Sequence, residues 1–477
     1  MRMRFPLGVS ILALLLAGCA NFEARPSMEV RIPQSFQQTN ALTQDQKITG
    51  DWWKSANDPV LSSIIKDIET NNLSLEQARA RLQAARSNAR VGAFLPNITA
   101  GGDVQYNRLI KGTSAINPIA AGSAEKNTGY YNAKLDASWE LPIYGQAQDA
   151  LDSKRAGIEF AKADMEHIRL SMIAETIRLY SDMRRWQNTY AQRQKIEAAQ
   201  KQILGYKNIK HGAGLIDDKE KFEAERTYLA ATQDTRLALA ELTASKYQLA
   251  SILGITEIPA VWNDVAAIPD FKVDGIGQTP ADVLRLRPDI KRAEASVAQQ
   301  AAEFEISKSE IYPKFTLTGT LSQLANVLGN PLPATTMQLA GVPAVSIPLF
   351  DWGQRISRAE QENAKLKEAI AVYRQTVVEA MNEANEFMMA HEAAYNNKDT
   401  AIKQADLQSK SADLIEIEFQ KGTKSGIEKE QAFVMAAEAE IAAQTALAER
   451  AARLAALTKA LGVLSHSTSF PTGETHE

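Results

Sequence analysis

The sequence predicts an α+β membrane protein built from two similar halves, each with short strands and very long helices. Three observations lead to this prediction. The chain opens with a membrane-anchor signal, and its second half repeats the landmarks of its first half. Each half also combines segments of alternating polarity with a long stretch that contains no proline.

The amino terminus resembles the signal of a bacterial lipoprotein. Basic residues precede an apolar run over residues 7–16, and residues 16–19 (LAGC) resemble a lipobox. This pattern predicts a signal peptide over residues 1–18, followed by acylation of Cys19. A plain signal peptide with a chance cysteine is the alternative. Ala20 stands where inner-membrane lipoproteins commonly carry Asp, which favours sorting to the outer membrane of a Gram-negative bacterium.

Composition argues against most enzyme and nucleic-acid functions. The 477 residues include 53 basic and 57 acidic side chains, so no global positive charge attracts nucleic acid. The five histidines show no metal-ligand spacing, and there is no nucleophile elbow and no phosphate-binding loop. We therefore expect no catalytic residue, no metal and no cofactor, apart from covalent lipid on Cys19.

A long-range repeat relates the two halves. Three glycines recur 208 residues later, so that Gly145, Gly214 and Gly254 correspond to Gly353, Gly422 and Gly462. Upstream of these glycines the displacement is 217 residues, which relates residues 94–96 (FLP), Ile98 and Gly102 to residues 311–313 (IYP), Phe315 and Gly319. The halves therefore differ by one shorter loop.

The repeat predicts the order of segments along the chain. After the signal peptide we expect a lipidated segment over residues 19–74, repeat 1 over 75–254, a connecting segment over 255–284, repeat 2 over 285–462 and a tail over 463–477. Each repeat contains a helix that ends near a proline, two strands and a long helical hairpin.

The hairpins are predicted over residues 145–254 and 353–462, which contain no proline. A stripe at seven-residue spacing runs through both, as Ile158, Met165, Met172, Leu179 and Trp186 and then as Leu366, Tyr373, Ala380, Phe387 and Ala394. The spacing predicts coiled-coil helices of about 60 residues, on the order of 90 Å long.

Glycines are expected to form the hairpin turns, because glycine readily adopts the positive φ of a helix end. The turn residues predicted on this basis are Gly205, Gly212 and Gly214 in the first hairpin and Gly422 and Gly426 in the second.

Four segments alternate apolar and polar residues, at about 97–109, 129–141, 313–323 and 338–350. Alternation over about 9 to 11 residues suits a tilted strand that crosses a membrane. A half-buried soluble sheet shows the same alternation, so the pattern alone leaves both structures open. The anchor at Cys19 and the long polar loop over residues 111–129 favour the membrane.

Four strands cannot close a barrel, and open sheet edges are not tolerated in lipid. Several chains must therefore contribute strands. Three copies would supply about twelve strands. This number lies between the eight strands of a barrel filled by side chains and the sixteen strands of a porin, so a water-filled lumen is plausible. The sequence predicts a homotrimer on this ground.

Local motifs resemble the outer-membrane efflux family that includes TolC and OprM, in its lipoprotein branch. They comprise residues 51–53 (DWW), 58–61 (DPVL), 71–73 (NNL), 286–290 (LRPDI) and 348–353 (PLFDWG). The resemblance covers the chain from about Cys19 to Gly462.

This resemblance implies a trimer with a twelve-stranded β-barrel in the outer membrane, continued by a periplasmic α-helical barrel with a mixed equatorial domain. It implies a passive conduit for drugs or other toxic small molecules. The implied partners are a periplasmic adaptor and an inner-membrane pump of the resistance-nodulation-division class.

The resemblance also places the hairpin turns at the periplasmic entrance. The glycines implied for adaptor contact are Gly212, Gly214, Gly422 and Gly426. The acidic residues implied for a gate are Asp217, Asp218, Glu428 and Glu430. Rings of carboxylates can select cations, whereas the alternative is that these residues are solvated and suit the first turn of a helix. Lys424 stands close to where the family often carries an aspartate, which is a departure from the pattern.

Three other functions remain open. A lipid-anchored periplasmic adaptor also combines a lipobox with a helical hairpin, but it would have one hairpin and no repeated strands. A coiled-coil spacer between envelope layers would leave the alternating segments unexplained. A channel for type I protein secretion would share the predicted architecture.

Overall fold

The computed structural model describes residues 26–31, 33, 50–92, 94–108, 127–272, 279–326, 337–348 and 350–463. Cys19 and most of the polar loop predicted over residues 111–129 lie outside these ranges. The chain divides into two units. One unit contains residues 85–158 and 295–371, and the other contains residues 28–84, 159–294 and the chain from residue 372 onward.

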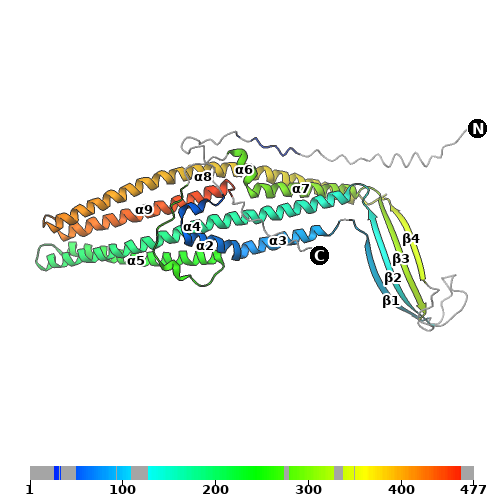
Figure 1. The fold of residues 1–477 in the computed structure, drawn as a ribbon, viewed down its shortest axis with the longest axis horizontal. Helices are drawn as coiled ribbons and strands as arrows, with labels where there is room; N and C mark the ends of the chain where they lie inside the picture. Colours follow the sequence, from blue (N-terminus) through cyan, green and yellow to red (C-terminus); the bar gives the residue numbers. More distant parts are fainter. Residues whose placement is uncertain are drawn as a thin grey trace, which may run out of the picture. The chain divides into compact units, whose positions relative to one another are not determined.

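The first unit contains a four-stranded sheet together with the ends of several helices (Figure 1). Its strands are β1 (Asn97–Arg108), β2 (Asn127–Leu141), β3 (Lys314–Asn326) and β4 (Met337–Ser346), all antiparallel in the order β1-β2-β3-β4. β2 begins two residues before the predicted segment. β4 ends four residues early, before Pro348, and it includes Pro343, which lies opposite Leu317 of β3.

The strand register places the apolar side chains on one face of the sheet. Leu135 of β2 lies opposite Ala100 of β1 and Leu321 of β3, and Leu321 lies opposite Leu339 of β4. Residues directly opposite each other share a face, so this row is apolar across all four strands.

The other face of the sheet is polar and internally hydrogen-bonded. Thr320 donates a hydrogen bond from its hydroxyl to Asp136 at 2.8 Å, and Lys134 lies 3.6 Å from the same carboxylate. Asn132 donates to Asp103 at 3.1 Å. These contacts join β1, β2 and β3. The sheet therefore has one apolar face and one polar face.

The registers of the two strand pairs repeat with the displacements seen in the sequence. Moving β1 residues by 217 and their β2 partners by 208 converts Ile98↔Ala137 into Phe315↔Val345 and Ala100↔Leu135 into Leu317↔Pro343. Every β3–β4 pair arises from a β1–β2 pair in this way. The two displacements therefore describe backbone pairing as well as residue types.

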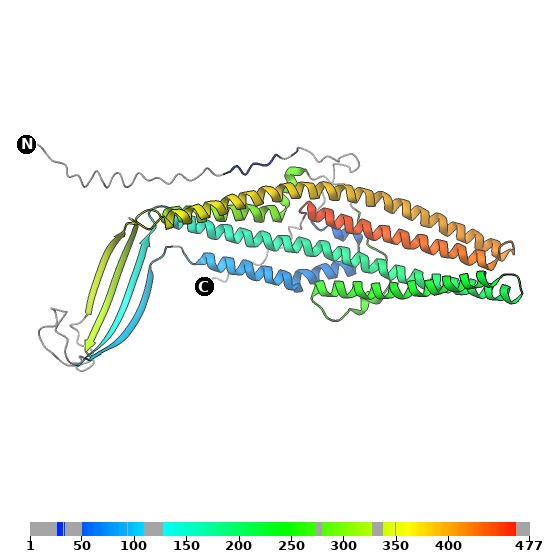
Figure 2. The same cartoon turned by 180° about the vertical axis from the view of Figure 1, so that it is seen from behind.

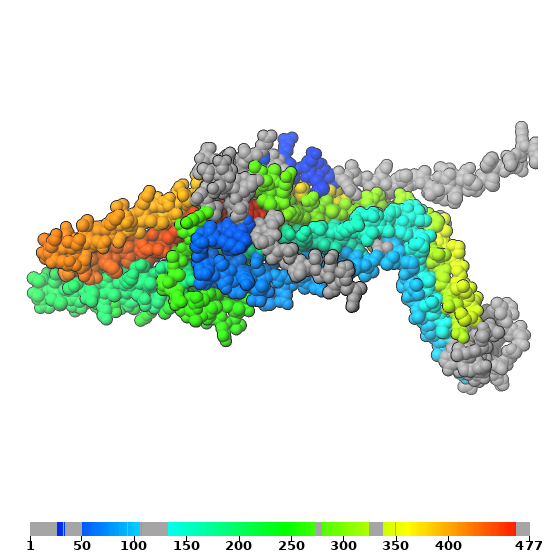
Figure 3. All heavy atoms as spheres, in the orientation of Figure 1, coloured from blue at the N-terminus to red at the C-terminus, as the bar shows by residue number. Residues whose placement is uncertain are grey.

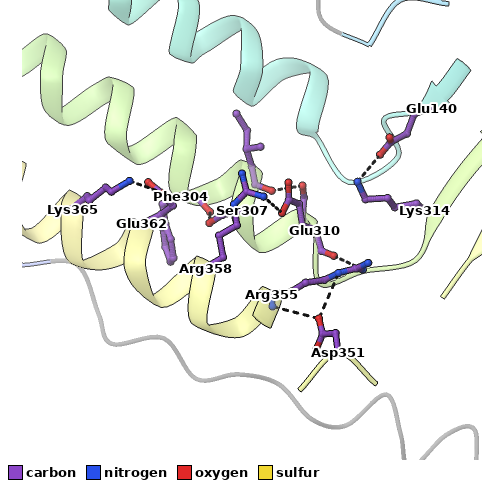
Figure 4. A network of polar contacts seen from close by, with 12 residues as sticks. Glu140, Phe304, Ser307, Glu310, Lys314, Asp351, Arg355, Arg358, Glu362 and Lys365 are labelled. Atoms are coloured by element: carbon purple, nitrogen blue, oxygen red, sulfur yellow. Dashed lines mark hydrogen bonds and ion pairs between the residues drawn. The ribbon is translucent and has the colours of Figure 1, made fainter. Parts of the chain in front are cut away.

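Ion pairs fix the passage from strands to helices in the same unit (Figure 4). Arg355 donates to the backbone oxygen of Glu310 at 2.9 Å, and Arg358 pairs with the Glu310 carboxylate at 3.1 Å. Lys314 at the start of β3 lies 3.3 Å from Glu140 near the end of β2. The strand ends are thus tied to one another and to the helix that follows.

Four long helices dominate the chain: α4 (Gln146–Gly212), α5 (Asp218–Leu253), α8 (Gln354–Gln420) and α9 (Gly426–Ala460). α4 and α8 have 67 residues each, which corresponds to about 100 Å of helix. They begin 208 residues apart, as do α5 and α9.

In the second unit these helices lie side by side in the order α5, α4, α9, α8 (Figures 1 and 2). Side-chain contacts agree with this order. Thr235 of α5 donates to the backbone oxygen of Arg193 on α4 at 3.2 Å. The Arg193 guanidinium pairs with Glu438 of α9, and Lys429 of α9 pairs with Glu416 of α8 at 3.1 Å.

Shorter helices pack around the long ones. They are η1 (Trp52–Ala56), α2 (Pro59–Asn71), α3 (Leu73–Arg90), η3 (Ala260–Asn263), α6 (Pro280–Leu286) and α7 (Pro288–Ser309). The main core of the second unit includes Trp52, Ile68, Tyr180 and Leu454, all nearly inaccessible to solvent. Among the described helices, none is long and apolar enough to cross a membrane.

Candidate functional site

The turn of the first hairpin lies between Gly212 and Asp218, and its carboxylates are engaged locally. Asp217 caps α5 by accepting a hydrogen bond from the backbone N–H of Glu220 at 2.9 Å. Asp218 lies 2.9 Å from the Nε2 of His211 on α4. Of the two predicted gate residues of this turn, Asp217 therefore caps α5 and Asp218 joins α5 to α4.

The turn of the second hairpin carries a capping box. Ser425 accepts from the backbone N–H of Glu428, and Glu428 accepts from the backbone N–H of Ser425 at 2.9 Å. Lys424 pairs with the same carboxylate at 3.0 Å. The Ser425 backbone N–H, the Lys424 ammonium and the Ser425 hydroxyl together lower the pKa of Glu428 to about 2. Lys424, which departs from the family pattern, thus partly neutralises the acidic residue beside it.

Only two of the predicted turn glycines adopt a positive φ, Gly214 at +70° and Gly422 at +77°. The prediction of a positive φ is wrong for Gly205, Gly212 and Gly426. Gly205 lies inside α4 and Gly212 is its last residue, while Gly426 is the first residue of α9.

Gly426 has a different role, because Tyr206 of α4 lies against it. A Cβ atom added at Gly426 would lie 2.7 Å from the Tyr206 ring, closer than real Cβ contacts allow. A larger residue at the start of α9 would therefore require the Tyr206 ring to move from its position between the two hairpins. Further from the turns, Arg193 pairs with Asp234 of its own hairpin and joins the two hairpins through Glu438 of α9.

A hollow of about 450 Å³ lies near these contacts, lined by residues of α4, α8 and α9. Glu430, the fourth predicted gate residue, lines it with only 16% of its side chain exposed. Lys429 lies 3.9 Å from Glu430 and above the Phe419 ring. Glu430 thus faces neighbouring helices and differs from the exposed Glu428.

The outer helix α5 has two apolar stripes on opposite sides. The buried stripe includes Ala224, Ala231, Ala238, Leu242 and Leu249. The exposed stripe includes Phe222, Leu229, Leu237 and Tyr247. At 3.6 residues per turn the two stripes lie about half a turn apart, so the side away from α4 is also apolar.

The outer helix α8 shows the same arrangement. Its buried stripe includes Ala380, Ala384, His391, Ala394 and Ala405. Its exposed stripe includes Val378, Met389, Leu407 and Leu414. Figure 3 shows α8 in orange and α5 in green along the two sides of the helical layer. Both sides of this layer therefore carry apolar surface.

A family model for outer membrane efflux proteins matches residues 64–255 and 279–463, which include the hairpins, the connecting helices and all four strands. This chain belongs to the outer membrane efflux protein family. The predicted family resemblance is confirmed, and so is a mostly helical chain with a small sheet.

Several known proteins resemble this chain over most of their length. Nodulation protein T of Rhizobium leguminosarum bv. trifolii is 24% identical over 79% of this chain and 80% of its own length. The pyoverdine export outer membrane protein OpmQ of Pseudomonas putida is 24% identical over 87% of this chain and 85% of its own. The crystal structure of the CmeC outer membrane channel of Campylobacter jejuni matches with a TM-score of 0.80 at 18% identity, covering 94% and 95% of the two chains.

The motifs that resemble the family are mainly packing and capping residues of this outer membrane efflux protein. Trp52 packs edge-on against Phe271, and Asp58 caps α2 while accepting a hydrogen bond from Tyr180 at 2.7 Å. Arg287 is buried and pairs with Asp289 at 2.6 Å. These motif residues therefore stabilise the packing of the helices. The contact of Tyr206 with Gly426 was not predicted from the sequence.

Proposed function

We propose that this protein is the outer-membrane channel of a tripartite efflux system. Three copies form a twelve-stranded barrel and a periplasmic helical barrel, through which drugs or other toxic small molecules pass without chemistry. The observation that carries this proposal is that both edges of the chain, in the sheet and in the helical layer, are suited to pair with further copies of the same chain.

The sheet has the height and polarity of a membrane-spanning element. Trp139 and Tyr106 lie on its apolar face toward opposite ends, separated by the ten β2 positions from Trp139 to Gly129, the partner of Tyr106. At about 3.4 Å per residue and a tilt of about 40° this spans roughly 26 Å, close to the apolar band of an outer-membrane barrel. Trp139 donates from its indole to the backbone oxygen of Phe94 at 2.8 Å, as an interfacial tryptophan would.

The helical layer supports closure into a ring. α5 and α8 are its outer helices, and each exposes an apolar stripe on the side away from its neighbour. In a closed ring, α5 of one copy would meet α8 of the next and cover both stripes. Burying a Leu or Phe side chain in this way contributes about 1.5 to 3 kcal/mol.

The anchor and partners belong to the same proposal. Acylation of Cys19 would add a lipid anchor beside the barrel. The hairpin turns around Gly214 and Gly422 would form the periplasmic entrance, where a periplasmic adaptor and a proton-driven inner-membrane pump dock. Asp217, Asp218, Glu428 and Glu430 would ring this entrance, with Glu428 partly compensated by Lys424.

Deletion of the gene, with complementation, tests the efflux function. Loss of the protein should raise susceptibility to at least one class of toxic small molecule, and the parent chain should restore resistance. A Cys19→Ala variant should lose lipid labelling, and labelling that persists would refute the lipobox. Unchanged susceptibility to every compound, together with a defect in protein secretion, would favour a type I secretion channel.

A further inference from the structure

The free edges of the sheet, β1 and β4, define an intersubunit strand pair. We infer that β4 of one copy pairs antiparallel with β1 of a second copy in one register, which places Val345 opposite Gly102 of the second copy. We further infer that Trp352 packs against Leu95 of that copy. This inference rests on the proposed ring of copies, and it adds the residue pairing at the interface.

The template for this interface lies inside one chain. β2 ends the strand pair of the first repeat and β3 begins that of the second, so the β2–β3 pair joins one repeat to the next. In a ring of copies, the β4–β1 pair joins one repeat to the next in the same way. The displacements of 208 for β2 to β4 and 217 for β1 to β3 are established by the matching registers of the other two pairs.

Applying these displacements to the β2–β3 pair gives the register between copies. Ala137 pairs with Gly319 within the chain, and this pair becomes Val345 opposite Gly102. Leu135↔Leu321 becomes Pro343 opposite Val104 in the same manner. Each position follows from an observed backbone pair, and none is fitted to the interface itself.

The polarity of the two strands provides an independent check. Val345 and Pro343 of β4 share the apolar face with Phe315 and Leu317, and Gly102 of β1 shares it with Ala133. The derived register therefore joins apolar face to apolar face. A slip by one residue would place every apolar side chain of β4 beside the polar face of β1.

The strand ends supply a second contact of the same kind. Within the chain, Tyr144 after β2 stacks on Tyr312 before β3, with ring centroids 5.0 Å apart. The same displacements convert this pair into Trp352 and Leu95. Trp352 is 85% exposed and Leu95 is 66% exposed.

Trp352 has an unusual backbone that fits this role. Its φ is +56°, a conformation that costs energy for a bulky residue and that persists where the surroundings require it. Phe350 supports the ring edge-on with centroids 4.6 Å apart. Contact with Leu95 of the second copy would cover a side chain that is otherwise held in solvent.

Engineered disulfides test the register directly. Residues directly opposite in an antiparallel ladder have Cα atoms about 4.5 to 5.5 Å apart, within the range that a disulfide spans. A Cβ at Gly102 has room, since its nearest neighbour is the Asn132 oxygen at 3.4 Å. The full-length Val345→Cys/Gly102→Cys variant, oxidised in outer membranes, should give a ladder of linked chains ending at three on non-reducing gels.

Three variants serve as controls. Val345→Cys/Asp103→Cys places the thiols on opposite faces and should lose the ladder. Ala137→Cys/Gly319→Cys joins the template pair and should crosslink within one chain only, which a mobility shift without oligomers reports. Each single-cysteine variant, which retains native Cys19, should give no ladder.

The particle size of each variant in detergent separates the possible failures. The register would be wrong, and the ring still correct, if the particle contains three chains but the Val345→Cys/Ala100→Cys or Val345→Cys/Val104→Cys variant crosslinks and the Val345→Cys/Gly102→Cys variant does not. A one-chain particle in the parent protein would overturn the proposed ring as well. The Trp352→Cys/Leu95→Cys variant is expected to crosslink between chains. If it does not, although the Val345→Cys/Gly102→Cys variant does, the contact between Trp352 and Leu95 is refuted.

Discussion

At the scale of single residues, the hairpin tips use their charges mainly for local structure. Asp217 caps a helix, Asp218 meets His211, and Glu428 completes a capping box beside Lys424. These contacts explain why acidic residues are favoured at the turns without any gate. A ring built from them would therefore carry less free negative charge than a count of carboxylates suggests.

We expect His391 to make the stability of the protein depend on pH. It is 1% exposed on α8, and its Nδ1 has no hydrogen-bond partner among the described residues. Burial, with a smaller effect of Arg450, lowers the pKa of His391 to about 4. The unfolded chain protonates this histidine below about pH 6.5, so stability is lost progressively as the pH falls from about 6.5 toward 4.

We expect the free energy of unfolding to fall by about 2 kcal/mol through His391 between pH 6.5 and pH 5. A His391→Gln variant, which cannot titrate there, should show a smaller fall. Denaturant midpoints measured at both pH values check this. Equal pH dependence in the variant and the parent protein would show that His391 is not the responsible group.

At the scale of elements, the contact between the two hairpins depends on Gly426. We expect Gly426→Ala to displace the Tyr206 ring from the start of α9, because the new methyl group would lie 2.7 Å from the ring. Hydrogen exchange should then increase in the last turns of α4 and the first turns of α9. Gly157, which has open space around it inside α4, provides the matched control substitution Gly157→Ala.

A second substitution distinguishes steric conflict from loss of a helix start. Tyr206→Ala combined with Gly426→Ala should restore slow exchange at the start of α9, because the clashing ring is gone. If the double variant exchanges as fast as Gly426→Ala alone, the close approach of Tyr206 is not the reason for the glycine.

The sequence predicts the elements better than the contacts between them. The four strands follow from the alternation of polar and apolar residues, and the two hairpins follow from the absence of proline and from the repeated glycines. Gly214 and Gly422 adopt the positive φ that was predicted for the hairpin turns. The role of Gly426 could not be predicted, because its partner Tyr206 is far away in sequence. Strand β4 ends before Pro348, four residues short of the predicted segment, because proline has no backbone N–H to donate to a strand ladder.

At the scale of the whole molecule, apolar stripes on the outer helices predict how copies associate. Leu407 of α8 is 66% exposed within its stripe. Leu407→Asp would place a charge in the apolar contact with α5 of the next copy, so we expect the trimer to dissociate in detergent. Asn397→Asp, on an exposed side of α8 about a quarter turn from both stripes, should leave it intact. Light scattering of both variants checks this, and equal masses would contradict the proposed contact.

The repeat also explains which features of assembly could be read from sequence. In the proposed barrel, four strands per chain require strands of other chains, because a sheet edge in lipid is unsatisfied. The order α5, α4, α9, α8 is not encoded in any local pattern, since it depends on pairs such as Arg193 with Glu438. That order shows why the exposed stripes of α5 and α8 face outward from the layer.

Conductance of the purified protein in a planar bilayer tests the central claim that copies of this chain close into one channel. We expect discrete conductance steps from a three-chain particle, and we expect none from Leu407→Asp if it dissociates into single chains. A three-chain particle that inserts into the bilayer without conductance, even after Asp217, Asp218, Glu428 and Glu430 are neutralised, would contradict the claim.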